Sequence, residues 1–104
     1  MVEVVTREEL KKGLAEGTIL LIDVREPNEY AAGHIPGATS LPLSRFDPAR
    51  LPKEPGKRVV FNCRSGQRTL QALEMARLSG RRDVTAHYAG SMLDWVAAGE
   101  PVEI

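Results

Sequence analysis

The single cysteine of the chain, Cys63, begins a short polar loop whose composition suits a reactive thiol. Four residues separate it from Arg68, and Arg64 follows it directly. The sequence predicts a buried strand before this loop and a helix after it, so the first N–H groups of the helix lack intrahelical partners. These N–H groups, the helix dipole and the two arginines all favour negative charge at the centre of the loop. We therefore expect the Cys63 thiol to ionise below the pKa of about 8.5 of a free cysteine, and its thiolate to act as a nucleophile.

The residues after Cys63 are poor material for a hydrophobic core. A lone cysteine is often merely buried, but this one is followed by polar residues and a glycine. Gly66 permits a backbone conformation that a side chain would oppose. We predict that the loop binds an anionic substrate through Arg64, Ser65, Gly66, Gln67 and Arg68. Each arginine can instead be a solvated surface charge, and Arg68 can pair with an acidic neighbour. Ser65 either donates its hydroxyl to the substrate or only shapes the loop.

Two strands are expected to bring polar residues to the same edge of a sheet. Thr18–Val24 and Arg58–Asn62 are short apolar runs with β-branched residues, a pattern typical of buried parallel strands. Asp23 lies at the end of the first run, and Cys63 follows the second. Ligands of open α/β sheets bind beyond the carboxyl ends of the strands, so the sequence places the site there.

Asp23 and Arg25 are predicted to lie near the site and to position its residues without contacting the substrate. The carboxylate of Asp23 can orient Arg68, and the alternative is a structural ion pair, such as Arg25 with Glu29. We weigh the two interpretations evenly for Asp23 and favour the structural one for Arg25.

The remaining elements alternate between strand and helix. Thr6 and Glu9 form a capping-box pattern at a helix start. The sequence predicts strands over Val2–Val5 and Val84–Tyr88, and helices over Arg7–Glu16, Pro27–Ala31, Gly66 to about Leu78, and from Gly90 to Gly99. The fold class is therefore α/β, an open, mostly parallel sheet with helices on both faces. With 104 residues, we expect one domain over residues 1–104.

Composition narrows the range of partners. Lys+Arg and Asp+Glu both number 14, so no field of one sign favours nucleic acid or an anionic membrane. One cysteine cannot form an internal disulfide or a multi-cysteine zinc site, and no cluster has metal-ligand spacing, so we expect neither metal nor cofactor. A free thiol suits a reducing compartment, and no signal peptide is visible, so we expect a cytoplasmic protein.

The histidines and large apolar side chains have simpler interpretations. His34 lies in the Gly33–Ala38 turn and is expected to fix that turn rather than to act in catalysis. His87 is isolated and is assigned no role. Trp95 and Met92 have helical spacing typical of core positions, and Tyr30 is expected in the core too.

Four segments in this order make the sequence similar to the rhodanese domain family, from about Thr6 to Glu103. They are Asp23-Val24-Arg25-Glu26 with Glu29-Tyr30; Gly33–Ala38; Cys63–Arg68; and Tyr88-Ala89-Gly90 with Trp95 and Gly99-Glu100-Pro101. One departure is that Ala89 or Ser91 replaces the family's second glycine after the last strand, which we expect to affect local packing alone.

The resemblance implies a sulfurtransferase cycle. Cys63 would attack the outer sulfur of a small anionic donor such as thiosulfate, sulfite would leave, and the enzyme would hold a persulfide. A thiophilic acceptor, which is cyanide, a thiol or a protein, would then remove the sulfur, with ping-pong kinetics. No second cysteine is present to discharge the persulfide within the chain.

Two alternatives remain open. The first is a persulfide carrier or binding module that receives sulfur from a desulfurase and passes it on. The second is a cysteine phosphatase or arsenate reductase. The related phosphatases have five residues between cysteine and arginine, whereas Cys63 and Arg68 are separated by four, which favours a cradle sized for one sulfur atom.

Overall fold

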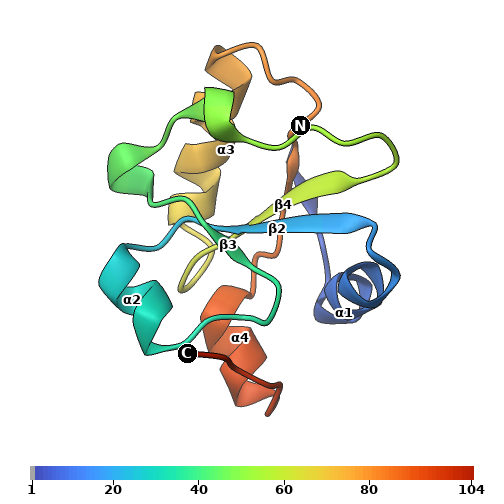
Figure 1. The fold of residues 1–104 in the computed structure, drawn as a ribbon, viewed down its shortest axis with the longest axis vertical. Coiled ribbons are helices and arrows are strands. Elements are labelled where there is room, and N and C mark those ends of the chain that lie inside the picture. Colours follow the sequence, from blue (N-terminus) through green and yellow to red (C-terminus); the bar gives the residue numbers. More distant parts are fainter. Residues whose placement is uncertain (1) are drawn as a thin grey trace.

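Five short parallel strands form one sheet in the order β1-β5-β4-β2-β3 in the computed structural model, which describes residues 2–104 (Figure 1). The strands are β1 (Glu3–Val4), β2 (Ile19–Asp23), β3 (Thr39–Ser40), β4 (Arg58–Asn62) and β5 (Ala86–His87). The helices are α1 (Arg7–Glu16), α2 (Pro27–Ala32), α3 (Arg68–Leu78) and α4 (Ser91–Ala97), with 3-10 turns η1 (Leu43–Arg45) and η2 (Pro48–Arg50). The predicted α/β sheet is confirmed. No helix within residues 2–104 has the length and apolar character needed to cross a bilayer.

The central strands β2 and β4 end side by side, as predicted. Their register pairs Asp23 with Asn62, and the N–H of Val24 donates to the carbonyl oxygen of Asn62 at 3.0 Å. Parallel strands carry their carboxyl ends to one edge, so Cys63, the next residue after β4, emerges beside the end of β2. This edge is the one at which open α/β sheets bind ligands.

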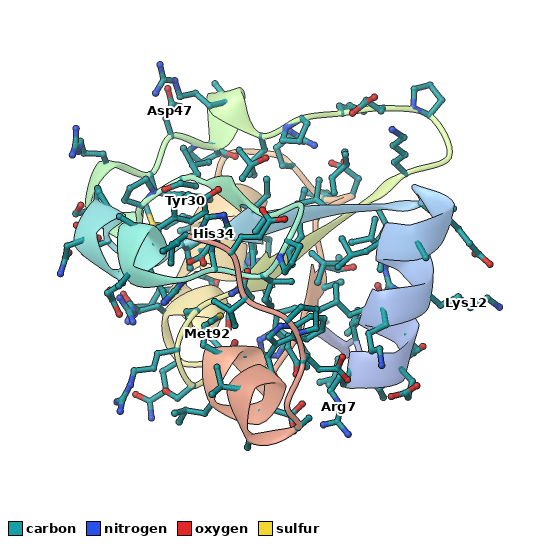
Figure 2. The ribbon with its side chains drawn as sticks, turned by 60° about the horizontal axis from the view of Figure 1, so that its bottom comes forward. Arg7, Lys12, Tyr30, His34, Asp47 and Met92 are labelled. Atoms are coloured by element: carbon teal, nitrogen blue, oxygen red, sulfur yellow. The ribbon has the colours of Figure 1, made fainter. Side chains whose placement is uncertain are left out.

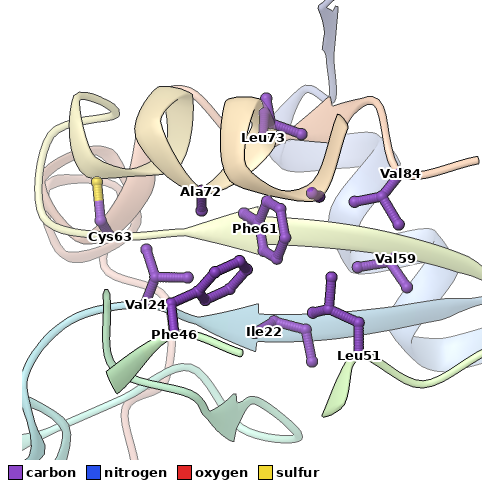
Figure 3. Packing of buried hydrophobic residues seen from close by; sticks show 11 residues of the cluster. Ile22, Val24, Phe46, Leu51, Val59, Phe61, Cys63, Ala72, Leu73 and Val84 are labelled. Atoms are coloured by element: carbon purple, nitrogen blue, oxygen red, sulfur yellow. The ribbon is translucent and has the colours of Figure 1, made fainter. Parts of the chain in front are cut away.

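Hydrophobic clusters cover both faces of the sheet, because successive residues of a strand point to opposite faces. Along β4, Val59 and Phe61 belong to the cluster beneath α3, whereas Val60 belongs to the cluster on the opposite face. Figure 3 shows the first cluster, which continues along the strand direction to Cys63. Figure 1 shows α3 on one side of the sheet and α1 and α4 on the other, so the prediction of helices on both faces is confirmed.

Local capping explains where α1 begins and ends. The N–H of Glu9 donates to Thr6 Oγ1 at 3.1 Å, and the N–H of Thr6 donates to Glu9 Oε1 at 2.9 Å. The helix ends at Gly17, whose φ of 72° is left-handed. The predicted capping box and the predicted bounds Arg7–Glu16 are therefore confirmed.

Helix α3 begins two residues later than predicted, at Arg68 rather than Gly66. Gly66 has a φ of 88°, which no right-handed helix allows, and its N–H is directed to the sulfur of Cys63 instead of to solvent. The helical spacing of Leu70, Leu73 and Ala76 predicts one shared buried face, but Leu70 is 47% exposed. Leu73 and Ala76 are buried as predicted, and Thr69 and Ala72 complete the buried face of the helix.

Residues 39–51 contain the elements that the sequence did not predict. β3 has two residues and no apolar run, and η1 and η2 are single turns within a proline-containing stretch. This segment nevertheless contributes Phe46 and Leu51 to the cluster beneath α3. The ring of Phe46 packs edge-on against Phe61 of β4, at a centroid distance of 5.7 Å.

Candidate active site

The sulfur of Cys63 lies where the sheet ends and α3 begins. Figure 3 shows it at the end of the cluster beneath α3, directed toward the first turn of that helix. The N–H of Gly66 donates to Cys63 Sγ at 3.1 Å. The residue is 1% exposed, so the surrounding residues cover the thiol almost completely.

Backbone N–H groups determine the ionisation of this thiol. Burial raises the pKa of Cys63, but hydrogen bonds from the N–H groups of Thr69, Gly66, Ser65 and Arg68 lower it further than burial raises it. The pKa therefore lies below the ordinary value of a cysteine thiol, in the predicted direction. A buried sulfur facing several N–H groups is a site for a negative charge on sulfur, and not simply a packed cysteine.

Glycine is required at position 66 for two independent reasons. Its φ of 88° disfavours any side chain, and an added Cβ would lie 2.4 Å from the carbonyl oxygen of Ala89. The peptide that follows is also held, because Thr69 Oγ1 donates to the Gly66 carbonyl oxygen at 2.9 Å. The loop therefore turns tightly at Gly66 and directs its N–H groups inward.

His87, to which the sequence assigned no role, lies beneath this loop. Its Nδ1 is 2.7 Å from Thr69 Oγ1, and only 4% of the residue is exposed. Thr69 has one hydroxyl proton, and the Gly66 carbonyl can only accept, so full pairing requires His87 to donate from Nδ1. The desolvated position lowers the pKa of His87, which favours this neutral donor. The sequence contains no signal that links His87 to the loop, because the two come together only when β5 pairs with β4 in the sheet.

Arg68 is engaged by Glu29 of α2 rather than left free. Its Nη1 lies 2.6 Å from Glu29 Oε1, and its Nη2 lies 2.9 Å from Oε2, a two-pronged ion pair. The hydrogen bond from Arg68 lowers the pKa of Glu29 to about 2, so the carboxylate stays charged at neutral pH. The acidic-neighbour alternative for Arg68 is therefore the arrangement that the structure has, and the pair joins the start of α3 to α2.

Asp23 and Arg25 pair with each other, which corrects both predicted partnerships. Arg25 Nη2 lies 2.8 Å from Asp23 Oδ2, and Arg25 Nε lies 3.0 Å from Oδ1. Asp23 is fully buried and pairs with Arg25, whereas Glu29 pairs with Arg68, so neither predicted ion pair is the one formed. Arg25 Nη2 also donates to the carbonyl oxygen of Gly33 at 2.7 Å. The pair ties the end of β2 to the turn after α2, because a charge buried there needs a partner.

The outer part of the loop is formed by exposed side chains. Arg64, Ser65 and Gln67 are all exposed, and the ion pairs found within residues 2–104 do not include Arg64. Arg64 thus carries the uncompensated positive charge of this loop. Its backbone is fixed, since its carbonyl oxygen accepts from the N–H of Leu93 at 3.0 Å.

Ser91 is the residue of this site that sequence reasoning missed. Its Oγ accepts from the N–H of Cys63 at 3.0 Å, and the N–H of Met92 donates to the carbonyl oxygen of Cys63 at 3.0 Å. The sequence feature that could have indicated this role is the departure from the family's glycine after the last strand, for which the resemblance predicts an effect on packing alone. The backbone of Cys63 is instead held at both its polar groups by the start of α4.

The other residues singled out in the sequence are structural. His34 stacks on Tyr30, with ring centroids 3.8 Å apart and planes 3° apart, and Figure 2 shows the two side by side. The backbone of His34 bridges to Glu103. Met92 and Trp95 are buried in the cluster opposite α3, as predicted. No group of three His, Cys, Asp or Glu side chains within residues 2–104 is placed to hold a metal ion.

The site and the sheet around it define a known class of domain. Residues 6–98 match the model of the rhodanese-like domain, so the chain belongs to this family, and several of its relatives are named as sulfurtransferases.

Individual relatives agree with this assignment. The chain is 36% identical to the human thiosulfate:glutathione sulfurtransferase, covering 88% of this chain and 91% of the relative. It is 42% identical to an uncharacterized protein of Synechocystis, covering 83% of this chain but only 48% of that relative. Among solved structures, the human single-domain sulfurtransferase TSTD1 superposes with a TM-score of 0.76 at 36% identity, covering 93% of this chain and 97% of that one.

The ionisation of Cys63 is open to direct measurement. Because N–H donors outweigh burial, the pH midpoint for alkylation of Cys63 by iodoacetamide should lie below that of the same chain unfolded in urea. Between the two midpoints the folded protein reacts as thiolate while the unfolded chain is still thiol. The single cysteine makes the readout specific. A folded midpoint at or above the unfolded one would contradict this account of the loop.

Two glycine substitutions separate loop geometry from general backbone strain. Gly66→Ala combines a positive φ with a collision against Ala89, so we expect a loss of about 2–4 kcal/mol in unfolding free energy and a raised thiol pKa. Gly17→Ala has a similar φ of 72° but nothing within 4 Å, and should lose about 1 kcal/mol with unchanged thiol reactivity. Denaturant unfolding and alkylation rates measure both effects. Equal behaviour of the two variants would show that the Ala89 contact does not determine the loop.

Proposed function

We propose that this protein transfers sulfane sulfur from a small anionic donor such as thiosulfate to a thiophilic acceptor, through a persulfide on Cys63. The observation that carries the proposal is the set of N–H groups facing Cys63 Sγ, with Gly66 N at 3.1 Å. A persulfide ends in an anionic sulfur, and preorganised N–H donors stabilise such a charge without reorganisation. The names of the human and yeast relatives, thiosulfate:glutathione sulfurtransferases, support this donor and a low-molecular-weight thiol as acceptor.

The proposed reaction has two balanced half-reactions. The Cys63 thiolate attacks the outer sulfur of thiosulfate, a new S–S bond forms, and the bond to the central sulfur breaks so that sulfite leaves with the electron pair. The acceptor thiolate or cyanide then attacks the outer sulfur of the persulfide. Its S–S bond breaks, and the electron pair returns to Cys63 as thiolate. No proton donor is needed for sulfite to leave, because sulfite departs as a stable anion.

Arg64 is our candidate for the cation that contacts the donor. It is exposed on the loop and takes no part in the ion pairs of the described residues, whereas the charge of Arg68 is balanced by Glu29. A dianionic donor gains most from a cation that is not already paired. We propose that Arg68 acts instead by joining α3 to α2, so that the N–H groups at the start of α3 stay in place.

A persulfide carrier is the second candidate, and it shares the chemistry at Cys63. The single cysteine fits this function too, because the sulfur of a carrier is also discharged by an outside acceptor. The two functions differ in the source of sulfur. Turnover with thiosulfate and a thiol or cyanide supports the enzyme, while capture of sulfur from a cysteine desulfurase without such turnover supports the carrier.

Intact-mass measurement tests the covalent step. Treatment with thiosulfate should add one sulfur atom to the protein, and cyanide should remove it. Cys63→Ser should keep the fold, since the hydroxyl is smaller and the cluster is otherwise unchanged, and should show neither addition nor turnover. Comparable hydrolysis of an aryl phosphate by the wild-type protein would instead favour the phosphatase alternative. Near wild-type turnover by the serine variant would exclude a persulfide on Cys63.

Alanine variants of the two loop arginines should differ in which property they change, substrate binding or stability. Arg64→Ala should raise KM for thiosulfate about tenfold, because one charge-assisted hydrogen bond contributes ~1.5–3 kcal/mol, and should leave stability unchanged. Arg68→Ala should lower the unfolding free energy by about 1 kcal/mol, because Glu29 loses its partner. Arg82→Ala, an exposed arginine beyond α3, is the matched control. If Arg64→Ala keeps the wild-type KM while Arg68→Ala raises it, the donor contact belongs to Arg68.

A further inference from the structure

Ser91 has an unusual backbone conformation for a residue with a side chain. Its φ is 53°, and among residues 2–104 it is the single non-glycine residue with a positive φ. The residue is fully buried. Glycine adopts this conformation without strain, so a serine here carries a steric penalty that its side chain must offset.

The hydroxyl of Ser91 is used in a defined way. Ser91 Oγ donates to the carbonyl oxygen of Tyr88 at 2.8 Å and accepts from the N–H of Cys63 at 3.0 Å. Its one proton is therefore committed to Tyr88, and a lone pair faces Cys63. Cys63 Sγ lies 4.0 Å away, so the hydroxyl acts on the backbone of Cys63 rather than directly on its sulfur.

The N–H of Cys63 needs this partner because of where the strand stops. β4 ends at Asn62, and Cys63 is buried, so water cannot replace a missing acceptor. The carbonyl oxygen of Cys63 is held by the N–H of Met92 at 3.0 Å. Both backbone polar groups of the nucleophile are thus fixed by the segment that begins α4, while its sulfur faces N–H groups at the start of α3.

The segment that holds Cys63 is itself fixed to the rest of the protein. The hydroxyl of Tyr88 donates to Asp94, and Arg7 of α1 binds Asp94 with Nη1 at 2.9 Å from the carboxylate. Trp95 Nε1 donates to the carbonyl oxygen of Pro101 at 2.7 Å. Ser91 therefore lies in a segment whose neighbouring side chains are held by hydrogen bonds. A hydrogen bond from Cys63 to its hydroxyl can keep Cys63 in place relative to that segment.

We propose that Ser91 is a positioning residue for the nucleophile: its hydroxyl fixes the backbone of Cys63 so that Sγ stays against the N–H groups of the loop. Because the bond is to the backbone, it persists in the thiol, thiolate and persulfide forms. The inference deepens the proposed function, but its primary readout, thiol ionisation, does not depend on that function. Without the hydroxyl, the unpaired N–H lets Cys63 shift and lengthens its contacts with the loop.

Alanine and glycine at position 91 separate positioning from stability. Ser91→Ala keeps the strained conformation and removes the hydroxyl, whereas Ser91→Gly removes both. We expect Ser91→Gly to be more stable than Ser91→Ala to denaturant, while both raise the thiol pKa. Alkylation of Cys63 by iodoacetamide at pH 7 should slow about three- to tenfold in each, because the shift of Cys63 weakens its contacts with the loop N–H groups by about the contribution of one hydrogen bond. Ser79→Ala, which loses a hydroxyl bond to Ala76 at the far end of α3, is the control.

The glycine variant gives the decisive result. A purely structural role predicts that Ser91→Gly, folded as stably as the wild type, keeps the wild-type pH profile of alkylation, and this outcome would overturn the proposal. If Ser91→Ala does not fold, Ser91→Gly still decides, because glycine fits the observed φ. Thiosulfate turnover is measured in parallel. If the wild type shows no turnover while the Ser91 variants still alkylate more slowly, the result refutes the proposed function and supports the positioning role.

Discussion

The structure depends on surrounding a buried sulfur atom with N–H groups that favour a negative charge on it. Burial alone would raise the pKa of Cys63, and the N–H groups of Thr69, Gly66, Ser65 and Arg68 reverse this effect. They can do so only if Gly66 turns sharply, if Thr69, which is itself bonded to His87, holds the Gly66 carbonyl, and if Cys63 does not move. The loop, the buried polar residues beneath it and the start of α4 all serve this one electrostatic requirement.

The charged residues near the site follow the same logic of compensation. Asp23 with Arg25 and Glu29 with Arg68 are internally neutral pairs that join β2, α2 and α3. Because each arginine in these pairs is neutralised by its carboxylate partner, it offers little net charge to a ligand. The number of arginines near a cysteine is therefore a poor guide to the positive charge near a bound substrate. Arg64, exposed at the rim, remains as the cation available to the donor in our proposal.

Much of the framework followed from local chemistry. The capping box at Thr6, the strand Arg58–Asn62 and the polar character of the loop after it could each be recognised from residues close in sequence. The position of Cys63 beyond a parallel strand also followed, because strand direction fixes which edge of the sheet a residue reaches. Errors came where local signals are weak: the two-residue strand β3, the turns at residues 43–50, and the exposed Leu70 on a helix with little amphipathic contrast.

The sequence by itself therefore determined the candidate nucleophile, the composition of the loop that follows it, the α/β architecture and the family. Only the tertiary structure decided which partner each polar group has. Arg68 meets Glu29 across 39 residues, Ser91 meets Cys63 across 28, and His87 meets Thr69 across 18. The physical reason is that each of these polar groups could form a hydrogen bond or ion pair with several partners of the right type. The packing of α2, α3 and α4 around the sheet selects one of them by bringing particular atoms within hydrogen-bonding distance.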